Sequence, residues 1–165
     1  MTDIENGNGG LHAYSFDRIS TGAPGTPAEE WNAYAKTPSG GKAIFRVPVR
    51  TQTEATVCTA HVFQQIPGQN RIFMGWYSQG TQVVDFVENA DGTISFREAG
   101  WFILEKANTW VSHVFKVRDN GNGTFTYWGA TGDFLLGTTG RSAIDVYEVT
   151  LPAPPKPASA GKNGK

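Results

Sequence analysis

Arg71-Ile-Phe-Met-Gly-Trp76-Tyr is the stretch that decides the fold of this chain, because it returns in changed form as Thr124-Phe-Thr-Tyr-Trp128-Gly. Trp76 and Trp128 are 52 residues apart, and strand-like segments of similar pattern follow both copies. A repeat of roughly 40–50 residues made of short strands is typical of stacked β-sheet blades. Because one blade cannot bury its apolar face alone, the two copies must pack against neighbouring sheets.

Two further residue pairs support the repeat. His61 and His113 also lie 52 residues apart, each in the first strand of a copy, and Asp85 and Asp145 each fall late in a third strand. We therefore predict an all-β fold of propeller-type blades, about two and a half four-stranded antiparallel blades. The repeated tryptophans Trp76 and Trp128 are expected to pack between blades, because a large aromatic side chain buries ~150–250 Å². Asp85 and Asp145 are expected to accept backbone N–H bonds from the turns that follow them.

Turn signals divide the chain into four segments. The predicted segments are a partial blade with a loop and short helix (1–54), a complete blade (55–108), a final three-stranded blade (109–151) and a disordered Pro-rich tail (152–165). The complete blade has strands over 55–65, 71–77, 81–87 and 94–104, and the final one over 109–117, 124–129 and 143–151. The residues between 130 and 140 are predicted to form an expanded loop, and the prolines from Pro152 onward exclude a fourth strand because Pro cannot donate to a ladder.

A closed propeller commonly has four or more blades, and this chain supplies fewer. Three arrangements stay open: the last part of a larger propeller, closure with another copy of the chain, or a small β-sandwich. We favour the first, because exposed strand edges at both ends of an isolated piece promote aggregation. The predicted partners are therefore the remaining propeller blades or another copy of the chain.

Composition excludes several classes of partner and compartment signal. The 165 residues carry a formal net charge of −1 and no basic stripe, so we predict no binding to nucleic acid. No apolar run approaches the ~20 residues of a membrane-spanning helix. The start of the sequence lacks the basic and apolar regions of a signal peptide. Cys58 is the single cysteine, which excludes an intrachain disulfide, and we interpret it as a buried, inert thiol.

The repeat resembles the LVIVD repeat family. The resemblance lies in His61-Val-Phe, in Met74-Gly-Trp-Tyr-Ser-Gln-Gly80 and in Val83-Val-Asp85-Phe, and it extends from about Thr56 to Leu151. It implies a β-propeller, an exported protein and no assigned activity for most members. This chain departs from the family in being short and in lacking an export signal. We expect an extracellular location from the resemblance, and a cytoplasmic one otherwise.

Candidate chemistry centres on the two repeated histidines. In a propeller the first strand lines the central axis, so His61 and His113 could contribute to an axial transition-metal site. This arrangement makes a metal-dependent oxidoreductase conceivable, by analogy with methanethiol oxidase-type propellers. The alternative is structural: each histidine bonds a neighbouring blade, and no cofactor is bound. We favour the structural interpretation, with the cofactor unknown.

The sequence favours a binding module over an enzyme. It contains no Gly-x-Ser-x-Gly motif and no phosphate-binding loop, so nucleophilic and phosphoryl-transfer chemistry find no support. Trp31 and Tyr34 stand in a non-repeated segment and are candidate contacts for a protein or carbohydrate ligand. We predict a binding or scaffold protein that acts through its loop face, with residues 20–38 and 130–140 as recognition loops. The alternatives are the metal-dependent oxidoreductase and a self-associating structural β-protein.

Overall fold

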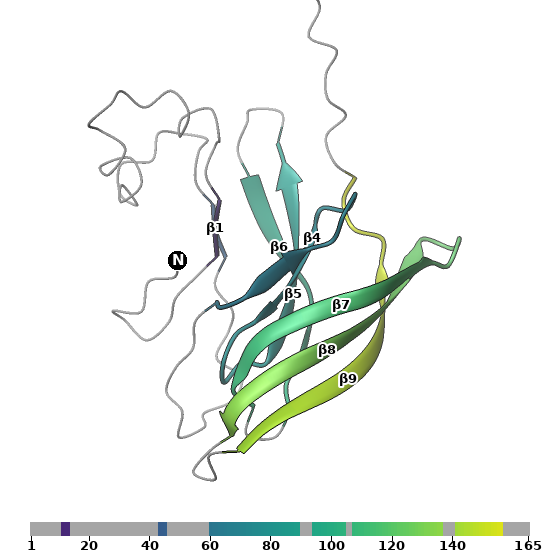
Figure 1. Ribbon diagram of the computed structural model, residues 1–165. Helices are drawn as coiled ribbons and strands as arrows, with labels where there is room; N and C mark the ends of the chain where they lie inside the picture. The colour runs from purple at the N-terminus through teal and green to yellow at the C-terminus, as the bar shows by residue number, and fades with distance from the viewer. Residues whose placement is uncertain are drawn as a thin grey trace, which may run out of the picture.

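The described part of the chain is built from β-strands alone. The computed structural model describes residues 11–13, 43–45, 60–89, 94–104, 107–136 and 141–156. The strands are β1 (Leu11–Ala13), β2 (Ala43–Phe45), β3 (Phe63–Gln65), β4 (Arg71–Gly75), β5 (Thr81–Glu88), β6 (Ile94–Phe102), β7 (Thr109–Asp119), β8 (Thr124–Leu136) and β9 (Arg141–Pro152). They form a β1–β2 pair, a four-stranded sheet in the order β3-β4-β5-β6 and a three-stranded sheet in the order β7-β8-β9, all antiparallel (Figure 1). The all-β prediction is confirmed.

The two larger sheets stack face to face, with β7–β9 lying across β3–β6 (Figure 1). Their facing sides form one apolar cluster. From the first sheet and its β3–β4 turn it takes Ile66, Phe73 and Val83, and from the second Val114, Tyr127 and Leu151. Inward positions alternate with outward ones along β9, where Tyr147, Val149 and Leu151 join this cluster. This alternation is the period of two that places one face of a strand in a core.

The β3–β6 sheet is covered on both of its faces along its central strand β4. Every residue of β4 is buried: Phe73 faces β7–β9, whereas Ile72 and Met74 belong to a second cluster on the opposite side with Trp76 and Val84. Leu11 of β1 packs against that second cluster. A strand buried on both faces needs a near-continuous apolar run, and Ile-Phe-Met supplies it. The β3–β6 sheet is therefore the central layer of the described structure.

The end of β3 is tied to β7 through backbone and side-chain hydrogen bonds. Val62 forms an isolated parallel bridge with Val111. Two residues further on, the Gln64 side chain donates from Nε2 to the Val114 carbonyl oxygen at 3.1 Å and accepts from the Val114 amide at 2.6 Å. Val114 lies beside a register shift in the β7–β8 pair. The Gln64 amide therefore takes the place of a neighbouring strand's peptide group at this point.

Replacing Gln64 with Ala is expected to lower the free energy of unfolding by about 1–3 kcal/mol, because both backbone groups of Val114 lose their partner in a partly buried place. Urea denaturation followed by circular dichroism measures the change. Gln65→Ala is the matched control, because its exposed side chain lies next in the chain and its loss should cost less than 0.5 kcal/mol, as is usual for surface changes. Equal losses for the two variants would show that the Gln64 contact contributes nothing.

The observed strands agree with most of the predicted ones. The strand predicted over 55–65 is shorter in the structure, where β3 begins at Phe63 and residues 55–59 lie outside the described part. The four- and three-stranded sheets have the predicted strand counts, and β9 ends at Pro152, where the prolines begin. The loop predicted for residues 130–140 is wrong for its first part, because β8 continues to Leu136. Residues 131–133 pair with residues 143–145 of β9, so ladder hydrogen bonding extends through a Gly-containing segment. Whether the two sheets are propeller blades stays a prediction.

Candidate binding surface

The outer face of the β7–β9 sheet changes from apolar to charged along the strands. Register places its outward residues in four rows, each contributed by β7, β8 and β9 in turn. The rows are Val111/Gly132/Ile144, His113/Ala130/Val146, Lys116/Trp128/Glu148 and Arg118/Thr126/Thr150. The first two rows, with Phe115 at the adjacent register shift, contain no formally charged side chain when histidine is neutral. We call these two rows the apolar half of the outer face.

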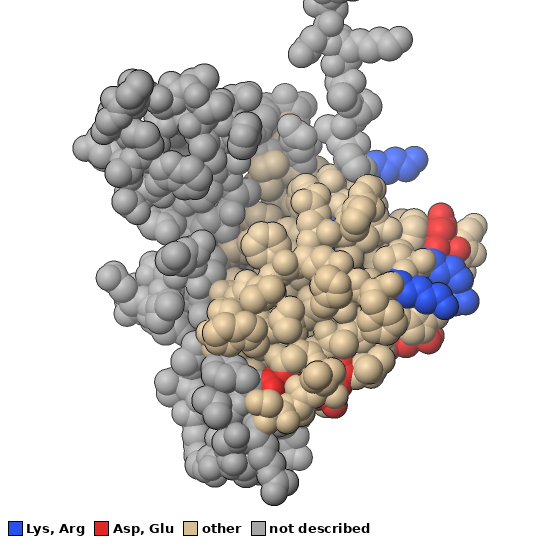
Figure 2. Space-filling view, viewed as in Figure 1, with Lys and Arg blue, Asp and Glu red and all other residues tan. Residues whose placement is uncertain are grey.

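The other two rows form the charged half of this face. Their charged side chains all contact one indole ring, that of Trp128. The Trp128 Nε1 donates to Glu148 at 2.6 Å. The Lys116 ammonium lies 4.4 Å from the centre of the Trp128 ring, and the Arg118 guanidinium lies 5.2 Å from it. Cations over an aromatic face are attracted by its quadrupole. The groups in these rows therefore partner one another, and Figure 2 shows basic side chains gathered at this end of the molecule.

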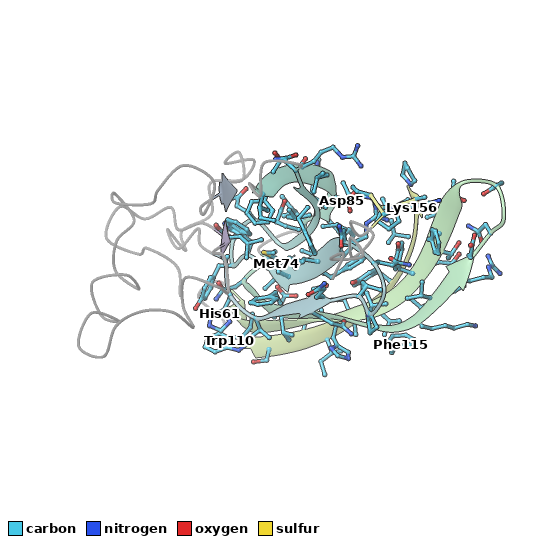
Figure 3. The ribbon with its side chains drawn as sticks, turned by 90° about the horizontal axis from the view of Figure 1, so that it is seen from above. His61, Met74, Asp85, Trp110, Phe115 and Lys156 are labelled. Atoms are coloured by element: carbon cyan, nitrogen blue, oxygen red, sulfur yellow. The ribbon has the colours of Figure 1, made fainter. Side chains whose placement is uncertain are left out.

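The apolar half leaves large side chains in contact with solvent. Ile144 is 78% exposed, Val146 is 72% exposed and Phe115 is 61% exposed. Between them, the central strand β8 presents only Gly132 and Ala130. Uncharged side chains cover the middle of the β7–β9 side of the molecule in Figure 2, and Phe115 points away from the interior in Figure 3. Contiguous exposed apolar surface of this kind marks an interaction site.

An aromatic cluster stands at the first end of β7. The His61 imidazole and the Trp110 indole have centroids 3.7 Å apart, and both rings meet Tyr77 edge-on, at 5.2 Å and 6.0 Å. The His61 Nδ1 lies 3.0 Å from the Trp110 carbonyl oxygen. Figure 3 shows His61 and Trp110 side by side where β3 approaches β7. Trp110 nevertheless remains 41% exposed, so the cluster both joins the two sheets and adds an aromatic ring to the molecular surface.

The Tyr77 backbone explains how its ring reaches this cluster. Tyr77 has a φ of +44°, which is rare for a residue with a Cβ atom. It lies in the turn between β4 and β5, and its N–H and C=O groups both bond to Thr109 at 2.9 Å. Two hydrogen bonds to β7 thus hold a backbone conformation that costs free energy. The strained turn and the ring contacts together fix the first end of β7 on the β3–β6 sheet.

A buried polar network holds the two sheets at the other end of β4. Asp85 accepts from Arg71 Nε at 2.7 Å and from Arg71 Nη2 at 3.0 Å, and it also accepts from Arg97 at 2.9 Å. Arg71 Nη1 donates to the Tyr127 hydroxyl of β8 at 2.9 Å. Tyr127 in turn donates to Gln69. Burial raises the pKa of the Tyr127 hydroxyl, and the neighbouring Arg71 charge opposes that rise.

Two predictions about repeat positions are corrected by these contacts. Asp85 accepts from two arginine side chains, in place of the predicted backbone N–H groups of a turn. Asp145 lies on β9 opposite Thr131, so the two carboxylates have different surroundings. Trp76 is fully buried in the cluster beneath Leu11, whereas Trp128 lies half-buried on the outer face. The repeated tryptophans therefore do not occupy equivalent packing positions.

The predicted ligand contacts are placed as follows. Trp31, Tyr34 and Cys58 lie outside the described residues, as does the segment 20–38. His61 belongs to the aromatic cluster, whereas His113 lies in the middle of β7 opposite Ala130 with an exposed side chain. Within the described ranges, no three His, Cys, Asp or Glu side chains come together as a metal site would need. A role of these histidines in binding metal stays a prediction.

The sequence interpretation missed Ile144 and Val146. A signal for them was present: in the alternation of β9, Tyr147, Val149 and Leu151 are the inward positions, so outward positions should be polar. Two β-branched residues at outward positions break that pattern.

In the described residues no helix has the length and apolar character needed to cross a membrane. No protein-family model matches the chain, and comparison with curated proteins and with solved structures gave no significant match.

Proposed function

We propose that this protein is a non-catalytic binding module that holds a protein partner on the apolar half of its outer face. One observation carries the proposal: within the described residues nothing covers the outer face of β7–β9, which presents Ile144, Val146 and Phe115, the three most exposed large apolar side chains. Burying an aliphatic or aromatic side chain of this size stabilises a complex by about 1.5–3 kcal/mol.

The chemistry of this surface favours a protein over a carbohydrate or a nucleic acid. Its exposed side chains are mainly aliphatic, and Trp128, the indole on the same face, is already covered by Lys116 and Arg118. A flat sheet face with small residues along its middle strand accommodates another β-sheet layer, since stacked sheets pack ≈ 10 Å apart. If the two sheets are propeller blades, a further blade would pack on this face. That blade would then be the protein partner.

The proposed recognition surface is a sheet face, whereas the sequence predicted a loop face. The loop face predicted from the sequence included residues 130–140, of which 130–136 belong to β8. Ala130 and Gly132 still contribute, now as the small residues between two rows of larger side chains.

Site-specific photo-crosslinking in the cells from which the protein comes tests the proposal. A benzophenone amino acid at position 144 is expected to give a discrete crosslinked band, which mass spectrometry identifies as either a second copy or another protein. The same amino acid at Arg118, on the charged half of the same face, is the matched control and should give at least tenfold less product. Equal yields at the two positions, or no band at 144, would refute a partner on the apolar half. Purified partner should then bind the wild-type protein and lose affinity for Ile144→Ser.

A further inference from the structure

Strand β9 forms an edge with few of the features that normally prevent strand addition. In the described part of the chain β8 is the one strand paired with β9, and this pairing runs without a register shift from Ala143 to Pro152. Edge strands are usually short or interrupted by Lys, Pro or a bulge. β9 has 12 residues and meets its first proline at its last position. Within the described ranges no strand pairs with the other side of β9, whose backbone groups therefore form a long template for another strand.

The outward side chains of β9 favour strand addition as well. Ile144 and Val146 are β-branched, lie two residues apart on one face and are the most exposed large apolar residues described. Residues of this type suit strand pairing, because they pack across the ladder against the neighbouring strand. A strand added at β9 would place its own side chains beside both of these residues and would also use the backbone groups on the side of β9 away from β8.

We infer that β9 pairs antiparallel with β9 of a second copy of this chain, so that two three-stranded sheets become one continuous six-stranded sheet. This inference rests on the proposed function and names the partner. Closed twofold dimers are the commonest homo-oligomers, and their interfaces must be self-complementary. A twofold axis normal to the sheet keeps the outer face of one copy continuous with the outer face of the other.

Charge disfavours two registers of this pairing. Centring the axis on Asp145 would place the two Asp145 carboxylates directly opposite each other, which destabilises a strand pair. Centring it on Val146 would place Ile144 opposite Glu148. Centring it on Ile144 avoids both arrangements, because Asp145 then lies opposite Ala143 of the second copy.

The register centred on Ile144 also completes the apolar half. The two Ile144 side chains meet on the axis, and each Val146 lies opposite Ser142 of the second copy and diagonal to its Ile144. Four aliphatic side chains thus form one cluster across the new strand pair, continuous with Ala130 and Gly132 on the two β8 strands. Glu148 falls beyond the paired segment, which runs from residue 141 to residue 147.

Sedimentation of the purified full chain, over a concentration series up to about 500 µM, tests the association itself. We expect a reversible monomer–dimer equilibrium. Ile144→Lys should raise the dissociation constant at least tenfold, because it places two ammonium groups together on the axis. Thr150→Lys is the matched control: it adds the same charge to an exposed position on the same face of β9, beyond the paired segment 141–147, and should leave the dissociation constant unchanged. Near-UV circular dichroism checks that both exposed variants keep the native packing.

Disulfide trapping tests the register. In a Cys58→Ser background, Ile144→Cys should form a disulfide-linked dimer on mild oxidation, because directly opposite Cβ atoms lie ~4.5–5.5 Å apart, close to disulfide distance. Val146→Cys should not, because its two copies are separated by four residue steps, roughly 13 Å. A chain that is monomeric at every concentration, a dimer dissociated by Thr150→Lys and not by Ile144→Lys, or trapping through Val146→Cys alone would overturn the inference. A crosslink from position 144 exclusively to a different protein would also overturn it, while leaving the proposed function standing.

Discussion

Replacing Asp85 with Asn is expected to lower the free energy of unfolding by about 3–5 kcal/mol, the usual cost of removing one partner from a buried ion pair. Asp85 and Arg71 both have fully buried side chains, and the carboxylate accepts two hydrogen bonds from the same guanidinium. The variant leaves the Arg71 charge between two apolar sheets without a counter-charge. For a chain of 150–250 residues, each kcal/mol shifts the melting temperature by roughly 2–4 °C, so a fall of roughly 6–20 °C is expected.

Two further variants separate this effect from a simple loss of charge. Arg97→Gln removes the third donor to Asp85, but that side chain is 65% exposed, so the cost should stay near the 0–1 kcal/mol of a surface ion pair. The double variant Arg71→Met with Asp85→Leu removes both buried charges and should recover much of the stability lost in Asp85→Asn, because apolar pairs often replace buried ion pairs at little cost. Thermal unfolding of the three variants measures these losses of stability and the recovery in the double variant. A loss of less than 1 kcal/mol in Asp85→Asn would mean that water reaches the pair.

The buried pair also shows what the sequence could reveal about the fold. Strand positions could be predicted over Arg71–Gly75 and Thr81–Glu88 because apolar runs there end at Gly-containing turns. The register that sets Arg71 opposite Asp85 depends on the type of turn between these strands. The sequence does not reveal that turn type, so the register could not be predicted. The sequence therefore indicated a hairpin, without indicating that a fully buried arginine belongs to it.

The predicted loop was wrong over residues 130–136 for a different physical reason. Thr131-Gly-Asp133 has the composition of a loop, yet Asp133 accepts from the Asn108 amide at 2.9 Å and from the Thr109 hydroxyl at 2.8 Å. These bonds hold the end of β8 against the start of β7. Local propensity is a weak guide where tertiary hydrogen bonds supply the partners for a polar residue. The pairing of β7 with β8 brings these donors to Asp133 and so explains a buried aspartate in a strand.

The candidate surface could be predicted in part. Alternation along β9 was sufficient to identify Ile144 and Val146 as apolar residues at solvent-facing positions, once the inward residues were known. The contribution of β8 could not be seen in the same way. Ala130 and Gly132 become part of the surface because register places them between His113 and Val146 and between Val111 and Ile144. Side chains that are unremarkable in the sequence thus make the middle of the apolar half flat.

Replacing Gly80 with Ala is the second change expected to have a large effect, with a loss of about 2–5 kcal/mol of unfolding free energy. Gly80 has a φ of +67°, and it closes the turn from β4 to β5 by accepting from the Trp76 amide at 2.8 Å and donating to the Tyr77 carbonyl at 2.9 Å. A Cβ atom there would overlap the backbone carbonyl oxygen of Phe102 and lie 2.9 Å from the Ile103 Cα. Because both neighbours are backbone atoms of the adjoining segment, no side-chain rotation relieves the overlap.

Gly68→Ala is the control that isolates this overlap from backbone strain. Gly68 has a nearly equal φ of +72°, but an added Cβ atom meets nothing within 4 Å. Its substitution should therefore cost only the left-handed backbone conformation, about 1–2 kcal/mol. Urea denaturation of both variants measures the difference, which should be at least about 1 kcal/mol with unchanged slopes, the lower end of the cost of overpacking. If the two alanines cost the same, the turn that carries Tyr77 to β7 can move away from β6. The aromatic cluster with His61 and Trp110 would then be held by its ring contacts and the Thr109 hydrogen bonds, without a fixed turn beneath it.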